Sequence, residues 1–173
     1  YFFVPRDNAK ARSDRDGVDY MSWISQGYII ATEGNVTDYS FIRKKINELS
    51  KKYRIQSIAY DRWNASQLVI DLIGDGATLS PIGMGFASQS APTKQLEKLI
   101  LSKEIEHDGN PVLRWMMGNV QLEIDAADNQ KISKKKSKEK IDGVAATIMA
   151  LAEYMTEEKE GDSVYDNRGL LIL

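Results

Sequence analysis

The chain has 173 residues, of which 42% are hydrophobic and 28% charged, as expected for a globular domain with a substantial core. It contains no cysteine and one histidine, which excludes disulfides, thiolate zinc sites and sites built from several imidazoles. No apolar run is long enough to predict a membrane span, and the opening residues are too few and too soon charged for a signal peptide. The cytoplasm is therefore the expected compartment.

The elements expected along the chain alternate between helices and strands. Residues 1–20 are expected to form a polar loop, and residues 83–86 a second loop. The apolar spacing then predicts helices over 19–24, 37–53, 64–73, 92–102, 111–117 and from 141 to the polar tail at 157, with strands over 28–32, 55–61, 77–82 and 120–124. This alternation predicts an α/β layered domain in which some strands are parallel, with its sites beyond the carboxyl ends of the strands.

Asp61 lies where the strand predicted over 55–61 should end, on the same face as Ala59. An acid at that place can be a metal ligand at the rim of the sheet, or it can cap the helix that follows. Asn64 already offers a cap, which Gln67 would complete three residues later. Both interpretations of Asp61 stay open on spacing alone.

Asp142 opens the apolar helix that follows Ile141. A carboxylate in the first turn is stabilised by the helix macrodipole, which is a sufficient structural reason for an acid there. The alternative is that Asp142 faces the rim of the sheet, so that a divalent ion is held between it and Asp61. Because cysteine is absent and histidine single, oxygen ligands would have to hold that ion, which favours Mg²⁺ or Mn²⁺.

The charge is unevenly distributed, although its sum is only −2. Acidic residues gather after 157, whereas lysines gather directly before Asp142. A lysine run is commonly a solvated loop, but beside a metal site it can neutralise the phosphates of DNA. The candidate DNA-binding residues are Lys134, Lys135, Lys136, Lys138 and Lys140.

Two further side chains carry weaker signals. His107 precedes a turn over 108–111 and is expected to serve that turn more than any chemistry. Trp63 adjoins Asp61 and could stack on a base, with core packing as the alternative that also applies to Trp23 and Trp115.

Five segments, taken together and in this order, resemble the nuclease domain of the large terminase subunit of tailed bacteriophages. They span the chain from about residue 20 to 156. The segments are Gly34-Asn35-Val36-Thr37-Asp38-Tyr39, Ala59-Tyr60-Asp61-Arg62-Trp63-Asn64-Ala65-Ser66-Gln67, Gly85 to Lys94, His107 to Trp115, and Ser137-Lys138-Glu139-Lys140-Ile141-Asp142-Gly143-Val144-Ala145-Ala146.

The resemblance implies an RNase H-like α/β fold, a mixed central sheet with flanking helices, over residues 1–156, followed by an acidic tail over 157–173. It implies a metal-dependent endonuclease that cuts double-stranded DNA during genome packaging, in the host cell cytoplasm, by hydrolysis with two Mg²⁺ or Mn²⁺ ions. In that family Asp61 matches the acid that ends a sheet strand, and Asp142 matches the acid of the C-terminal helix. An upstream ATPase domain, the small terminase subunit and the portal are the implied partners.

The family pattern also has a third acid, on the first strand of the sheet in a Gly-x-Asp segment. This chain has no such segment, so we expect that strand to be absent from it and metal affinity and cleavage to be weak. Asp125 or Asp128 is an alternative source of a ligand. Two other functions stay open: an RNase H-like resolvase or transposase, and a non-catalytic fragment that binds DNA or a packaging partner.

Overall fold

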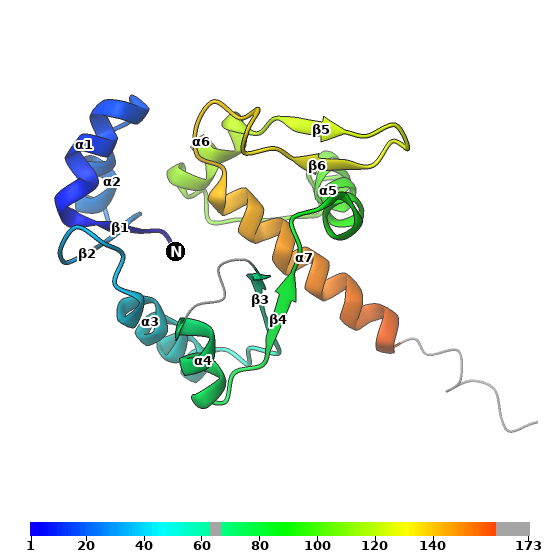
Figure 1. Ribbon diagram of the computed structural model, residues 1–173, viewed down its shortest axis with the longest axis horizontal. Helices are drawn as coiled ribbons and strands as arrows, with labels where there is room; N and C mark the ends of the chain where they lie inside the picture. Colours follow the sequence, from blue (N-terminus) through cyan, green and yellow to red (C-terminus); the bar gives the residue numbers. More distant parts are fainter. Residues whose placement is uncertain (63–66, 162–173) are drawn as a thin grey trace, which may run out of the picture.

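The computed structural model describes residues 1–62 and 67–161 and shows a mixed α/β domain (Figure 1). The helices are α1 (Arg6–Asp16), α2 (Tyr20–Ser25), α3 (Tyr39–Lys52), α4 (Gln67–Gly74), α5 (Phe86–Leu101), α6 (Pro111–Asn119) and α7 (Asp142–Gly161). The strands are β1 (Phe3–Pro5), β2 (Ile30–Thr32), β3 (Ile58–Asp61), β4 (Leu79–Ile82), β5 (Leu122–Ile124) and β6 (Gln130–Ile132). No helix in the described part is both long and apolar enough to cross a membrane.

The described strands form three separate pairs. β1 and β2 are parallel, β3 and β4 are parallel, and β5 and β6 form an antiparallel hairpin. The expected parallel pairing is confirmed, while the mixed sheet expected at the centre is divided into these pairs. Figure 1 shows the β1–β2 pair well apart from the β3–β4 pair, with α7 passing from α6 across to β3 and β4.

Helix α7 is the centre of the packing. Ile141, Val144 and Ile148 are each 1% exposed, and they belong to one buried cluster with Val4 of β1 and Val112 of α6. The predicted apolar stripe of this helix is therefore confirmed. The helix continues to Gly161, beyond the point at which the polar tail was expected to begin.

Aromatic side chains pack at the edge of this core. The ring of Tyr20 lies 5.7 Å from that of Trp23 and 6.2 Å from that of Trp115, both edge to face, and the two tryptophan rings are 5.6 Å apart. The core-packing interpretation is confirmed for Trp23 and Trp115. Trp63 and Asn64 lie outside the described residues.

The prediction of a loop over residues 1–20 is wrong, because the segment contains β1 and α1. Helix α1 begins after Pro5 and stops at Gly17, whose φ of 65° is the left-handed conformation that ends many helices. Only Ala9 and Asp16 are buried in it. A helix that buries so little apolar surface has no hydrophobic period for sequence analysis to detect.

Two other element predictions need correction. Helix α5 begins at Phe86 and not at Pro92, which lies buried inside it. A proline there loses one backbone hydrogen bond, and the burial of its ring in the protein offsets part of that loss. Strand β6 was missed, because it is only three residues long and lies among lysines, although Ile132 is buried.

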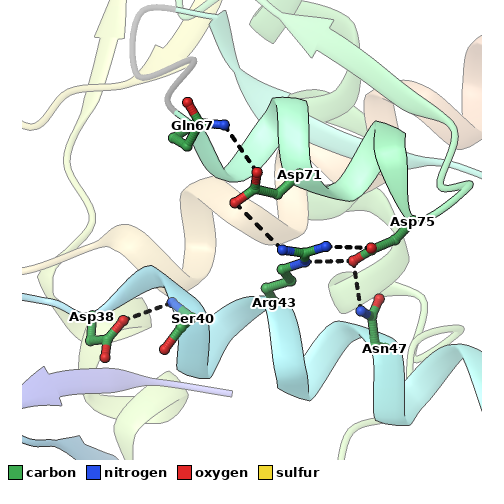
Figure 2. Close-up of polar contacts among 7 residues, drawn as sticks. All are labelled: Asp38, Ser40, Arg43, Asn47, Gln67, Asp71 and Asp75. Carbon is green, nitrogen blue, oxygen red and sulfur yellow. Dashed lines mark hydrogen bonds and ion pairs between the residues drawn. The ribbon is translucent and has the colours of Figure 1, made fainter.

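Helices α3 and α4 are joined by a polar brace (Figure 2). Arg43 on α3 donates to Asp75 after α4, with Nε 2.6 Å from Oδ2, and Asn47 donates to the same oxygen at 2.7 Å. A second arm of Arg43 lies 3.7 Å from Asp71, which also accepts a hydrogen bond from Gln67. The brace positions α4, the first helix after the strand that ends at Asp61.

Candidate functional site

Asp61 is the last residue of β3, as predicted. It is half-buried and lies opposite Ile82 in the parallel pairing with β4. Strand β3 packs against α7, where Ala59 lines a pocket together with Ala150 and Glu153. Glu153 also accepts a hydrogen bond from Ser80 of β4 at 2.5 Å, so both strands are fixed to the same helix.

Asp142 is the first residue of α7, as predicted, and its side chain is 58% exposed. The ammonium of Lys134 donates to Oδ1 of this carboxylate at 2.7 Å. The next residue, Gly143, lies against Phe2, which precedes β1, and against Leu113 of α6: a Cβ there would come within 2.8 Å of the Phe2 ring and 3.1 Å of Leu113. The start of α7 is thus packed between Phe2 and α6 while the carboxylate of Asp142 stays open to solvent.

The two acids lie toward the same end of the layer formed by β3 and α7. In Figure 1 the arrows of β3 and β4 point upward, to the side on which α7 begins, and α7 descends past them. Ala59 of β3 and Ala150 of α7 line the same pocket. Asp61 lies about 7 Å from Ala59 along the strand, and Asp142 lies about 12 Å from Ala150 along the helix. That both acids bind one ion stays a prediction.

The carboxylate oxygens of Asp61 and Asp142 are the type of ligand that a hard divalent cation prefers. Mg²⁺ is commonly held by one or two carboxylates and several waters, and Asp61 with Asp142 would supply such a set. One oxygen of Asp142 is already paired with a positive charge, the ammonium of Lys134. Within the described residues, however, no group of three or more Asp, Glu, His or Cys side chains could surround an ion.

The five candidate DNA-binding lysines are all exposed, and they lie on a loop that is fixed to the protein. Ser133 N–H donates to the Gln121 carbonyl at 2.9 Å, and Gln121 N–H donates to Ser137 Oγ at 3.1 Å. Asn119 donates to the Lys140 carbonyl at 3.1 Å. The backbone of the lysine loop is therefore held in place while its five lysine side chains are exposed, with the Lys134 ammonium paired to Asp142.

The remaining candidates have local structural roles. Asp125 accepts hydrogen bonds from Asn129 and Ala127 in the β5–β6 turn, and these bonds hold its pKa below the usual value. Asp128, in the same turn, forms an ion pair with Lys94 of α5 at 3.5 Å. Figure 1 shows this turn far from the start of α7. His107 accepts a hydrogen bond from Gly109 at 2.9 Å, in agreement with a role in its turn.

Sequence analysis missed an acid near Asp142. The side chain of Asp16 is 1% exposed and is bound by Arg15, with Nε–Oδ1 at 2.5 Å and Nη2–Oδ2 at 3.1 Å, and by the hydroxyl of Tyr20 at 2.9 Å. The Arg15 guanidinium and the Tyr20 hydroxyl hold the pKa of Asp16 below its usual value, although burial acts in the opposite direction. No local pattern signals this acid, because Asp16 ends α1 while its partner Tyr20 begins α2.

Two adjoining cavities flank the start of α7. The first, about 390 Å³, lies between the end of α1 and the lysine loop, and the second, about 440 Å³, lies between α1, β1 and α7. Three side chains line both of them: Arg15, Lys140 and Asp142. The exposed carboxylate therefore stands where the two cavities meet. The first is lined mainly by charged and polar side chains, whereas most of the side chains that line the second are apolar.

The family model for the endonuclease domain of the terminase large subunit matches residues 1–158. The chain belongs to this family. Its relatives include the large terminase subunit of Enterobacteria phage HK97, 31% identical over 96% of this chain, and protein YmfN of Escherichia coli K12, 30% identical over 96%. The resemblance noted from the five segments is thereby confirmed.

Solved terminase structures have the same fold. The crystal structure of the HK97 large terminase superposes on 87% of the chain with a TM-score of 0.81 and 31% identity. The nuclease of the large terminase from the thermophilic phage G20c covers 69% with a TM-score of 0.55, and at 15% identity it supports the fold alone. The expected RNase H-like α/β class is confirmed. This terminase nuclease domain spans 34% and 38% of the lengths of its two curated relatives.

Proposed function

We propose that this domain is a metal-dependent endonuclease that hydrolyses phosphodiester bonds of double-stranded DNA during phage genome packaging. The single observation that carries the proposal is the exposed carboxylate of Asp142, which pairs with the Lys134 ammonium beside the lysine loop in a terminase nuclease fold. The carboxylate would bind the metal, and the lysines would bind the negatively charged backbone of the substrate.

Asp61 and Asp142 would hold Mg²⁺ or Mn²⁺. Such an ion, when bound, supplies a lowered pKa for an attacking water and charge stabilisation at the leaving oxygen. When the metal binds Oδ1 of Asp142, the Lys134 ammonium would leave this oxygen and pair with a DNA phosphate, because one carboxylate oxygen cannot bind both cations. Lys135, Lys136 and Lys138 would add charge neutralisation that does not depend on base sequence.

The larger assembly follows from the family. A longer terminase chain with an ATPase domain, a small terminase subunit and a portal would be the partners, and the reaction would take place in the cytoplasm of the host cell. These partners are proposals that rest on the relatives, of which this chain spans about a third.

A second candidate is a DNA-binding module that does not cut. The observation in its favour is that the described residues contain no cluster of three acids, while two metal ions need several carboxylate oxygens. Such a module would keep the lysine loop and its affinity for DNA, but it would show no turnover with any divalent metal.

The test is to incubate the chain with supercoiled plasmid and Mn²⁺. We expect relaxed or linear plasmid from the parent chain and from Asp125→Asn, which alters an acid of the β5–β6 turn. Asp61→Asn and Asp142→Asn should each abolish the reaction. Cleavage that persists in both of these variants contradicts the metal site. A parent chain that binds plasmid without cutting it supports the non-catalytic module, and preference for branched over linear DNA supports a resolvase.

A further inference from the structure

We propose that Arg15 of α1 is a phosphate-binding residue, which contacts the DNA backbone next to the phosphodiester bond that Asp142 would serve. The inference rests on the proposed function and extends the DNA-binding surface from the lysine loop onto α1, where no phosphate contact was expected.

Arg15 is held in a defined orientation from behind. Its Nε and one terminal nitrogen bind the two oxygens of Asp16, which is almost completely buried. The hydroxyl of Tyr20 donates to the same carboxylate, and the Tyr20 ring is fixed between Trp23 and Trp115. A guanidinium restrained in this way loses little side-chain entropy when it binds a further anion.

The N–H groups of Arg15 that Asp16 leaves unused are suited to bind a phosphate. A guanidinium has five N–H groups in a planar fork, and Asp16 uses two of them. The side chain of Arg15 is 60% exposed, so its other N–H groups can reach solvent. Phosphate oxygens match this planar fork with two parallel hydrogen bonds, which a lysine cannot reproduce.

The cavity in front of Arg15 has the matching charge. It is lined by cationic side chains from two separate parts of the chain, and two of its acids are already paired: Asp16 with Arg15 and Asp142 with Lys134. The other charged side chains that line the cavity are Lys138, Lys140 and Glu139, so the net charge of the lining is positive. A backbone phosphate could therefore lie between α1 and the lysine loop.

The position of the cavity selects a nucleic acid over a small free anion. Arg15 and Asp142 line both adjoining recesses, and Arg12, one helical turn before Arg15, lines the second. Three cationic side chains, Arg12, Arg15 and Lys140, therefore continue into the second recess past the acid proposed to hold the metal, while most of the other side chains that line this recess are apolar. A polyanion with regularly spaced phosphates fits such a row better than a single phosphate ion.

The experiment is fluorescence anisotropy of a labelled duplex of about 30 base pairs, in EDTA so that no cleavage occurs, at several salt concentrations. Arg15→Ala should weaken binding severalfold and make the slope of log Kd against log salt shallower by about 1. Arg15→Lys should keep the slope, since it keeps the charge, while part of the affinity is lost. Tyr20→Phe, which removes only the hydroxyl, should weaken binding less.

The matched control is Arg43→Ala, which removes an arginine that also binds an aspartate but lies outside both cavities. It should leave affinity and slope unchanged, and thermal melts of all variants confirm folding. If Arg15→Ala binds as the parent does while Lys138→Ala is weakened, the inference is overturned and the proposed nuclease stands. If the folded parent chain neither binds nor cuts duplex DNA, the proposed function fails and the inference fails with it.

Discussion

Two arginine–aspartate pairs in this domain have the same chemistry and different surroundings. Arg43 and Asp75 come from different helices, 32 positions apart, and join α3 to α4 across an exposed surface. Arg15 and Asp16 are sequence neighbours, but Asp16 is buried and Arg15 faces a cavity shared with Asp142. The first pair links elements, and the second orients a cation toward a cavity. Changes at the first should therefore alter stability, and changes around the second should alter function.

The largest expected effect is on the functional side. Asp142→Asn should lower Mn²⁺-dependent plasmid cleavage by about two orders of magnitude or more, because a neutral amide is a poor ligand for a divalent ion. The melting temperature should stay near that of the parent, since the lost partner is an exposed lysine. Asp75→Asn is the matched control and should cut normally. Equal loss of cleavage in both variants would remove the distinction between the two regions.

The next effect tests whether the functional region also has a structural requirement. Gly143→Ala should destabilise the fold by about 1–3 kcal/mol, because the added methyl meets the Phe2 ring at 2.8 Å and Leu113 at 3.1 Å. Gly118→Ala on α6 is the control, since no atom lies within 4 Å of the place that its methyl would take and alanine favours helix. Urea unfolding measures both. A Gly143→Ala variant as stable as the parent would show that the start of α7 is loosely held.

A smaller effect belongs to the α3–α4 brace. Arg43 and Asn47 lower the pKa of Asp75 to about 2, so this carboxylate stabilises the fold above its unfolded pKa of 3.8 and loses that contribution as pH falls toward 2. The parent should melt a few degrees above Asp75→Asn at pH 6, and the difference should narrow between pH 4 and pH 2. A difference that is constant across this range would assign the stabilisation to packing.

The smallest expected effect is on metal affinity. Lys134→Gln should tighten Mn²⁺ binding to the protein by a few-fold, because the ammonium no longer competes for Oδ1 of Asp142. Titration calorimetry measures the change, with Lys135→Gln as a control for the loss of one positive charge on the same loop. Equal tightening in both variants would indicate general electrostatics and no direct competition.

Sequence analysis recovered the parts of the fold that carry a hydrophobic period or a capping signal. The stripe of α7, the start of α6 at Pro111 and the end of β3 at Asp61 were all placed correctly. It failed at α1, whose polar residues bury only Ala9 and Asp16. Local spacing cannot show that a polar helix is needed to wall a cavity, because the partner residues lie more than a hundred positions away.

The same limit applies to the candidate site. Asp61 and Asp142 could be singled out because strand ends and helix starts can be read from local patterns. Asp16 could not, since its burial depends on Tyr20 and on the tertiary packing of two tryptophans. Nor could the Lys134–Asp142 pair be distinguished from the other lysines of the loop, which differ from Lys134 only in where the ordered backbone places them.

We propose that Asp61 and Asp142 bind the same divalent ion. Anomalous diffraction from crystals of the chain soaked in Mn²⁺ tests this proposal without relying on activity. We expect a manganese peak about 2 Å from a carboxylate oxygen of each acid, with the Lys134 ammonium moved away from Asp142. Manganese bound elsewhere, with Lys134 still paired to Asp142 in a fully soaked crystal, would contradict it.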